Sequence, residues 1–200
     1  DRLARFEREA KVLASLNHPN IAQVYGFEST AIAMELVDGL TLAEVLAAAG
    51  VPPELFDDPD NRISFALRSH LIRLCVDRTG CRHFGLLIGQ QGGLHSLGLL
   101  GLLVQHSADV GSALRSLVRC LHHHVQGAVT TLAVNDRTAM LSYSIYETQV
   151  EATDQTGDGA VAAMFNILRA LCGADWKPVE VLFAHRQPDD VRPFQQFFRA

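Results

Sequence analysis

DGAVAAMFNILRALCGADWKPVEVLFAHRQPDDVRPFQQFF, the stretch from Asp158 to Phe198, decides the expected fold because it joins two helical patterns through a strand-like one. Apolar residues recur at steps of three and four up to Cys172, the spacing of one face of an α-helix, and Gly173 is a typical C-terminal cap. Residues 179–184 are rich in β-branched and aromatic side chains and predict a strand. A second helical face follows at Val191, Phe194, Phe197 and Phe198. The stretch therefore predicts the closing unit of a compact domain.

Three more helices are expected upstream. The first begins after Ser64, a good N-cap, and ends at Gly80. The second spans Leu97 to His106, and the third spans about Val110 to Val125. The third carries an apolar stripe from Val110 to Leu121, which we expect either to be buried in its own domain or to form a partner surface.

A β-hairpin is expected at residues 129–146. VTTLAV at 129–134 and AMLSYSIY at 139–146 flank the polar turn NDRT, and Leu141, Tyr143 and Ile145 alternate with serines. This alternation predicts one buried and one wet face. With the strand at 179–184, the expected fold is α+β, with helices packed on a small antiparallel or mixed sheet.

Composition and net charge limit the classes of function expected for this chain. The chain has 48% hydrophobic and 20% charged residues, typical of a globular protein with a real core. Its net charge of −5 argues against nucleic-acid binding by this chain, because phosphate binding needs a basic face. Leu94 to Val104 is the most apolar stretch, yet it is too short and too rich in glycine to span a membrane, and the charged opening is no signal peptide. We expect a cytoplasmic protein.

No metal or cofactor site is expected. His122, His123 and His124 are consecutive, so on a helix their side chains point in different directions and cannot bind one ion together. The four cysteines form no Cys-x-x-Cys pair and are expected to be reduced core residues. Neither a Gly-x-Ser-x-Gly motif nor a cysteine motif for nucleophilic catalysis occurs, so we expect no catalytic residue.

A binding domain remains the best interpretation. Residues of a type suited to an apolar pocket with a few polar groups are His95, Tyr143, Tyr146, Arg169 and Trp176. They are selected by residue type alone.

The C-terminal three quarters of the chain resembles the effector domain of the AraC family of bacterial transcription regulators. The resemblance is carried by NILRALCGADWKPVEVLFAH at 166–185, PFQQFF at 193–198, HSLGLLG at 95–101, TGCRHFGLLIGQ at 79–90 and DPDNRISF at 58–65. It implies that residues 47–200 form a domain that binds a small-molecule effector and forms a homodimer. In that family a helix-turn-helix DNA-binding domain follows, and we expect this chain to lack it.

Residues 1–46 are similar to the middle of the small lobe of a bacterial serine/threonine protein kinase. RFEREAKVLASLNHPNIAQVYGFE at 5–28 and AIAMELVDGLTLAEVL at 31–46 carry this resemblance and imply a helix followed by two strands. It would make Glu9 the glutamate that pairs with the ATP-positioning lysine, Met34 the gatekeeper, and Glu35 to Val37 the hinge.

Kinase activity is not expected from this chain. Phosphoryl transfer needs a glycine-rich loop, a strand lysine, a catalytic aspartate and a metal-binding aspartate, and none of their motifs occurs here. The alternative function left open is therefore a catalytically incomplete regulatory segment of a serine/threonine kinase.

Overall fold

The computed structural model describes residues 24–28, 31–34, 41–58 and 61–199. The chain divides into two units, Asp1–Leu40 and Thr41–Ala200. In the first unit, strands β1 (Val24–Glu28) and β2 (Ala31–Met34) pair antiparallel, with an irregularity between Val24 and Gly26. The helix expected before them lies outside the described residues.

The second unit is α+β, as expected, and its described part contains seven α-helices and one two-stranded antiparallel sheet. Its elements in chain order are α2 (Leu42–Ala48), η1 (Pro53–Phe56), α3 (Phe65–Thr79), α4 (Phe84–Gln90), η2 (Leu94–Leu97), α5 (Leu99–Gln105), α6 (Val110–Cys120), η3 (Leu121–His123), β3 (Ala128–Val134), β4 (Ala139–Ile145), α7 (Thr153–Cys172) and α8 (Arg192–Phe198), where η denotes a 3-10 helix.

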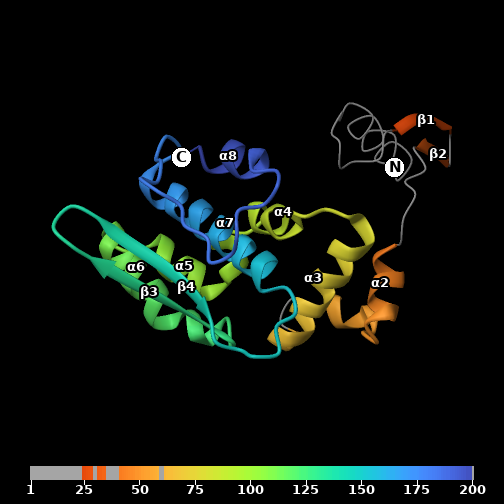
Figure 1. The fold of residues 1–200 in the computed structure, drawn as a ribbon, viewed down its shortest axis with the longest axis horizontal. Helices are drawn as coiled ribbons and strands as arrows, with labels where there is room; N and C mark the ends of the chain where they lie inside the picture. The colour runs from red at the N-terminus through yellow and green to blue at the C-terminus, as the bar shows by residue number, and fades with distance from the viewer. Residues whose placement is uncertain (1–23, 29–30, 35–40, 59–60, 200) are drawn as a thin grey trace, which may run out of the picture. The chain divides into compact units, whose positions relative to one another are not determined.

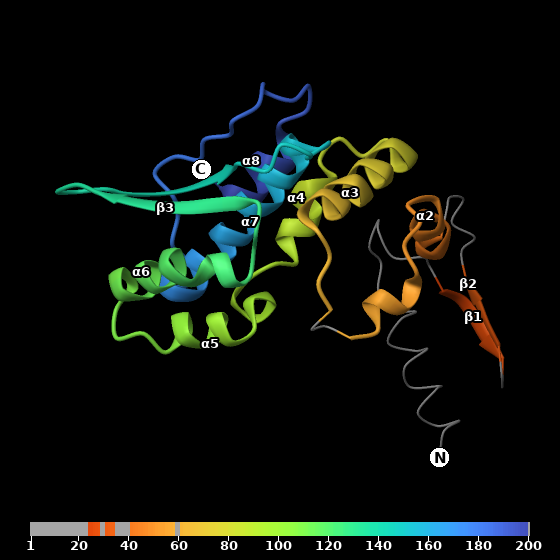
Figure 2. The ribbon, with the colours of Figure 1, turned by 90° about the horizontal axis from the view of Figure 1, so that it is seen from below.

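Helix α7 is the centre of this unit (Figure 1). Helix α4 packs along it, and strand β4 contacts it. Helix α6 lies under β3 and α5 lies under α6, so these elements form successive layers (Figure 2).

Two glycines of α4 allow its close packing on α7. A Cβ on Gly85 would lie 1.9 Å from the Gln155 carbonyl oxygen, and one on Gly89 would lie 2.3 Å from the Gly159 carbonyl oxygen. A side chain would therefore force the two helices apart. The Gln155 side chain adds a polar link, since its Oε1 accepts from the Gly85 N–H at 2.9 Å and its Nε2 donates to the Arg82 carbonyl at 2.9 Å.

Several expected helix ends are confirmed, because local capping determines them. Ser64 Oγ accepts from the Leu67 N–H at the start of α3, and Gly80 ends that helix with a φ of 65°. Gly173, with a φ of 103°, ends α7. The single helix expected at Leu97 to His106 is wrong in detail, because Gly98 with a φ of 57° separates η2 from α5.

The hairpin is confirmed with its expected faces. Ala128, Thr130 and Leu132 point inward on β3 and pair directly with Ile145, Tyr143 and Leu141 on β4. The turn is closed by Asn135, whose Oδ1 accepts from the Thr138 N–H at 3.0 Å and from the Thr138 hydroxyl at 2.6 Å.

The strand expected at residues 179–184 is wrong. Val181 and Phe183 are half-buried against the core, whereas Val179 and Leu182 are 94% and 68% exposed. Half-buried and exposed side chains therefore alternate as they do along a strand. However, this segment is not paired with either described sheet. Packing of alternate side chains on the helices, rather than sheet pairing, explains the sequence pattern.

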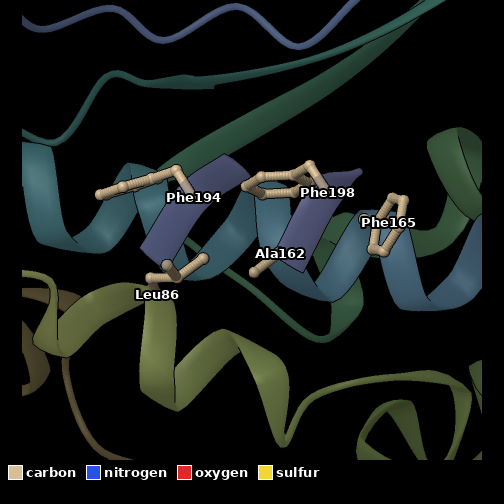
Figure 3. Packing of buried hydrophobic residues seen from close by; sticks show 5 residues of the cluster. All are labelled: Leu86, Ala162, Phe165, Phe194 and Phe198. Atoms are coloured by element: carbon tan, nitrogen blue, oxygen red, sulfur yellow. The ribbon is translucent and has the colours of Figure 1, made fainter. Parts of the chain in front are cut away.

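The core has two clusters of buried apolar side chains. The first comprises Leu86 from α4, Ala162 and Phe165 from α7, and Phe194 and Phe198 from α8 (Figure 3). The second comprises Val104 from α5, Ala113, Leu114 and Leu117 from α6, and Ile167 from α7. The middle of the α6 stripe is thus buried within its own domain, whereas Val110 at its start is 37% exposed, so the burial interpretation holds for most of the stripe.

Candidate functional site

A cleft lies between α8 and the segment that leads into it. Its volume is about 430 Å³, within the range of small-molecule sites. Apolar lining comes from Val181, Phe183 and Phe194, and polar lining comes from His185, Gln187 and Gln195. The cleft can therefore hold a small ligand that has an apolar body and a polar group.

The apolar wall of the cleft is continuous with the first core cluster. Phe183 packs edge-to-face on Phe194 with 5.4 Å between ring centroids, and its ring lies 5.8 Å from that of Phe198. Phe194 is only 8% exposed and belongs to the buried cluster seen in Figure 3. Edge-to-face pairs of this kind restrict ring movement, so the core supports this wall.

A buried acid lies behind the polar wall. Asp158 of α7 is 1% exposed, and its Oδ1 lies 2.7 Å from His185 Nε2. The other ring nitrogen, Nδ1, lies 2.8 Å from the Arg186 carbonyl oxygen. Because a carbonyl only accepts, Nδ1 carries a proton, and a second proton lies between Nε2 and the carboxylate.

The environment favours the protonated form of both groups. Burial raises the pKa of Asp158 and outweighs the opposing effect of its hydrogen bond with His185. Desolvation by itself lowers the pKa of His185, but hydrogen bonds with the Arg186 carbonyl and Asp158 outweigh it, so the net pKa is raised. Both shifts favour keeping the shared proton in the His185–Asp158 pair.

This arrangement suits binding rather than nucleophilic catalysis. A catalytic histidine must keep one ring nitrogen free to take a proton from a nucleophile. Here a carbonyl occupies one nitrogen of His185 and a carboxylate occupies the other.

The structure does not bring the five predicted pocket residues together, and none of them lines the cleft. Arg169 and Trp176 both lie beside Phe165, with the Arg169 Cζ 5.7 Å from that ring centroid and the Trp176 ring 6.1 Å away. The Arg169 guanidinium also donates to the Ala174 carbonyl at 2.9 and 3.1 Å, just beyond the end of α7.

The other three predicted residues lie apart. Tyr143 is half-buried on the inner face of the hairpin. Tyr146 is 64% exposed, and its hydroxyl accepts from the Gly127 N–H at 3.1 Å. His95 is exposed with Nε2 3.1 Å from the Gln91 carbonyl oxygen.

His185 and Asp158 were not among the residues predicted to form a site. They are 27 residues apart, and no local motif connects them. The one available signal was alternation: Val181, Phe183 and His185 occupy the inward positions of the segment, so a histidine follows two core residues in phase.

Three of the kinase-like positions, Glu9, Glu35 and Val37, lie outside the described residues. Met34 is the last residue of β2 and pairs with Val24.

Among the residues that the structure describes, no group of three His, Cys, Asp or Glu residues is placed to hold a metal ion. No described helix is long and apolar enough to cross a membrane. The four cysteines are free thiols, but the expected burial is wrong for Cys172, which is exposed beside the end of α7.

Comparison with known proteins gives two findings. The family described as "Arabinose-binding domain of AraC transcription regulator, N-term" matches residues 39–200. The chain is also similar to the ornithine utilization regulator of Pseudomonas aeruginosa, with 27% identity over 162 residues that cover 80% of this chain. The chain spans about half of that relative, 47% of its length.

Proposed function

We propose that this chain, which belongs to the AraC family of transcription regulators through their N-terminal arabinose-binding domain, senses a small-molecule effector in the cleft beside α8. The observation that carries the proposal is a cleft of ligand size whose apolar wall is part of the core and whose polar wall holds the His185–Asp158 pair. The effector is a small, largely apolar metabolite whose polar group meets the side-chain amides of Gln187 and Gln195, because both ring nitrogens of His185 already have partners.

Effector binding acts on DNA through another part of the protein. The chain is acidic overall, with a net charge of −5, which disfavours direct contact with phosphates. An effector that stabilises one arrangement of the cleft wall shifts the equilibrium between states of the whole regulator. The protein works in the bacterial cytoplasm, where its DNA is.

The domain also forms a homodimer, and the outer face of α5 is the surface that it uses. Leu99, Leu102 and Leu103 are 84%, 53% and 49% exposed, while Gly101 and Val104 of the same helix are buried. No Asp, Glu, Lys or Arg occurs between residues 83 and 108. A symmetric interface places a surface against its own copy, and an uncharged leucine face meets its copy without like-charge repulsion.

Cleft binding is tested by thermal shift with two variants of α8. Gln195 lines the cleft, whereas its exposed neighbour Gln196 does not. The probes are ornithine, after the name of the similar regulator, arabinose, after the name of the family, and a panel of small carboxylates. A ligand of the folded state raises the melting temperature as it saturates.

We expect that shift in the wild type and in Gln196→Trp, and its loss in Gln195→Trp, whose indole fills the cleft. An equal shift in both variants would place the effector elsewhere.

A further inference from the structure

A buried hydroxyl without a partner lies on the inner face of the hairpin. Thr130 is 3% exposed, and its Oγ1 has no hydrogen-bond partner among the described residues. A buried polar group in this state destabilises the fold by its lost hydration. Thr130 pairs directly with Tyr143, so the two side chains lie on the same face of the sheet.

The first turns of α3 reach the same end of the hairpin. A Cβ on Gly127, the residue before β3, would lie 2.7 Å from Cγ of Phe65. Arg68 is three residues after Phe65 and so lies on the same face of α3. Burial lowers the pKa of Arg68, and the proximity of Tyr143 partly opposes this shift.

The Arg68 side chain is not paired with a carboxylate in the described part of the chain. No hydrogen bond or ion pair holds the Arg68 guanidinium among the residues that the structure describes. Desolvation and repulsion from Arg62 and Arg68 lower the pKa of His124, so its neutral form is favoured and the two arginines carry the positive charge here. Two acids lie close to this end of the hairpin: Glu151 is paired with His70 at 3.0 Å, and the Glu147 carboxylate accepts from the Gln149 N–H at 3.1 Å.

We propose that this basic cluster, formed by Arg62, Arg68, His124, Thr130 and Tyr143, is an anion site that takes the carboxylate group of a small molecule. Arg68 supplies the guanidinium that a carboxylate prefers. Burial raises the pKa of Tyr143, so its phenol stays neutral and can donate a hydrogen bond. The Thr130 hydroxyl lies on the same face of the sheet and is a second neutral donor, without a partner in the described ranges.

The proposed site differs from the effector cleft and shares no residue with it. One half-buried guanidinium with two neutral hydroxyls matches a monoanion better than a dianion, which would bring a second charge into the same partly desolvated position. A bound carboxylate supplies the missing counter-charge of Arg68.

The test measures melting of the full chain with acetate, benzoate, inorganic phosphate or chloride at equal ionic strength. We expect acetate and benzoate to raise the melting temperature of the wild type saturably and chloride to leave it unchanged. In Arg68→Met, the ligand-free protein should melt at the same or a higher temperature, because an uncompensated charge is gone, and the carboxylate response should be lost.

A purely structural Arg68 gives the opposite result, in which Arg68→Met lowers the melting temperature and leaves the acetate response intact. That outcome overturns the proposal, as does a saturable response to phosphate that exceeds the response to acetate.

A second pair of variants tests Thr130 with a matched control. Thr130→Val removes the unpartnered hydroxyl and should weaken acetate binding roughly tenfold, without loss of stability. Thr131→Val changes the exposed neighbour on the opposite face of β3 and should leave acetate binding unchanged. Equal acetate affinity in the two variants contradicts the assignment.

Discussion

The Asp158 carboxylate in α7 lies 2.7 Å from Nε2 of His185, which is 27 residues later in the chain. The acid is 1% exposed, so the histidine is what compensates its charge. This contact ties the segment before α8, which forms one wall of the cleft, to the central helix of the domain.

The pair predicts a loss of stability as pH rises. The pKa of His185 in the folded state is raised above its usual 6.5. Its contribution to the free energy of unfolding is therefore complete below about pH 6.5 and is lost as pH rises through the folded-state pKa. The raised pKa of Asp158, from its usual 3.8, acts in the same direction, because the folded state again binds the proton more tightly. The nearby Asp154 also favours the protonated forms of both groups.

Melting curves between pH 6 and 9 measure this effect. As pH rises, the melting temperature of the wild type should fall more than that of His185→Gln. The difference should be about 2–4 °C for each 1 kcal/mol of unfolding free energy that the pair loses. His106→Gln, which replaces an exposed histidine, is the control and should follow the wild type. Parallel pH profiles for the wild type and His185→Gln would show that the pair does not titrate with folding.

The sequence predicted elements whose signals are local. Ser64 and Gly80 bound α3 through contacts within a few residues, and the alternation around Tyr143 followed from the pleat of a single strand. The segment at 179–184 was misassigned because alternation shows which side chains face a core and does not show whether another strand pairs with the backbone.

The candidate sites depend on contacts between distant parts of the chain. In the sequence, Asp158 is a polar residue near the start of a predicted helix. It gains His185 as a partner only because the later segment packs over α7. In the sequence, Arg68 has the pattern of an ordinary surface cation. It becomes half-buried, with no paired carboxylate among the described residues, only because the hairpin lies beside α3. No pattern within either element contains that information.

The crossing of α4 and α7 predicts opposite effects for two glycine substitutions. Gly85→Ala places a Cβ 1.9 Å from the Gln155 carbonyl oxygen, so the helices must separate, and the free energy of unfolding should fall by about 1–3 kcal/mol or more. Gly157→Ala, in the same helix as Gln155, meets no atom within 4 Å. It should raise the free energy of unfolding by about 0.5–1 kcal/mol, because alanine favours a helix over glycine. Urea denaturation measures both values, and equal effects would contradict the close approach.

The leucine face of α5 predicts a variant that separates self-association from folding. Leu102→Glu places a carboxylate at a residue that is 53% exposed, so the monomer should keep its melting temperature at low concentration. In a symmetric dimer the new charges would face each other, and light scattering should report a monomer. Val179→Glu changes a side chain that is 94% exposed outside α5, and it should leave the dimer intact. A wild type that remains monomeric at high concentration would contradict the dimer, and a dimeric Leu102→Glu would place the interface elsewhere.

Residues 41–200 should fold without the preceding unit, because α2 carries its own start signal. The Thr41 hydroxyl accepts from the Glu44 N–H at 3.3 Å and the Glu44 carboxylate accepts from the Thr41 N–H at 2.6 Å, which forms a complete capping box. Val45, Leu46 and Val51 are then 7%, 3% and 5% exposed.

A protein that begins at Thr41 should give one cooperative melting transition. A protein that begins at Pro52 lacks these three side chains, each worth about 1.5–3 kcal/mol when buried, and should melt at a clearly lower temperature. Aggregated or molten 41–200 would show that the first unit completes the core, and equal melting of the two truncated proteins would show that α2 adds nothing to it.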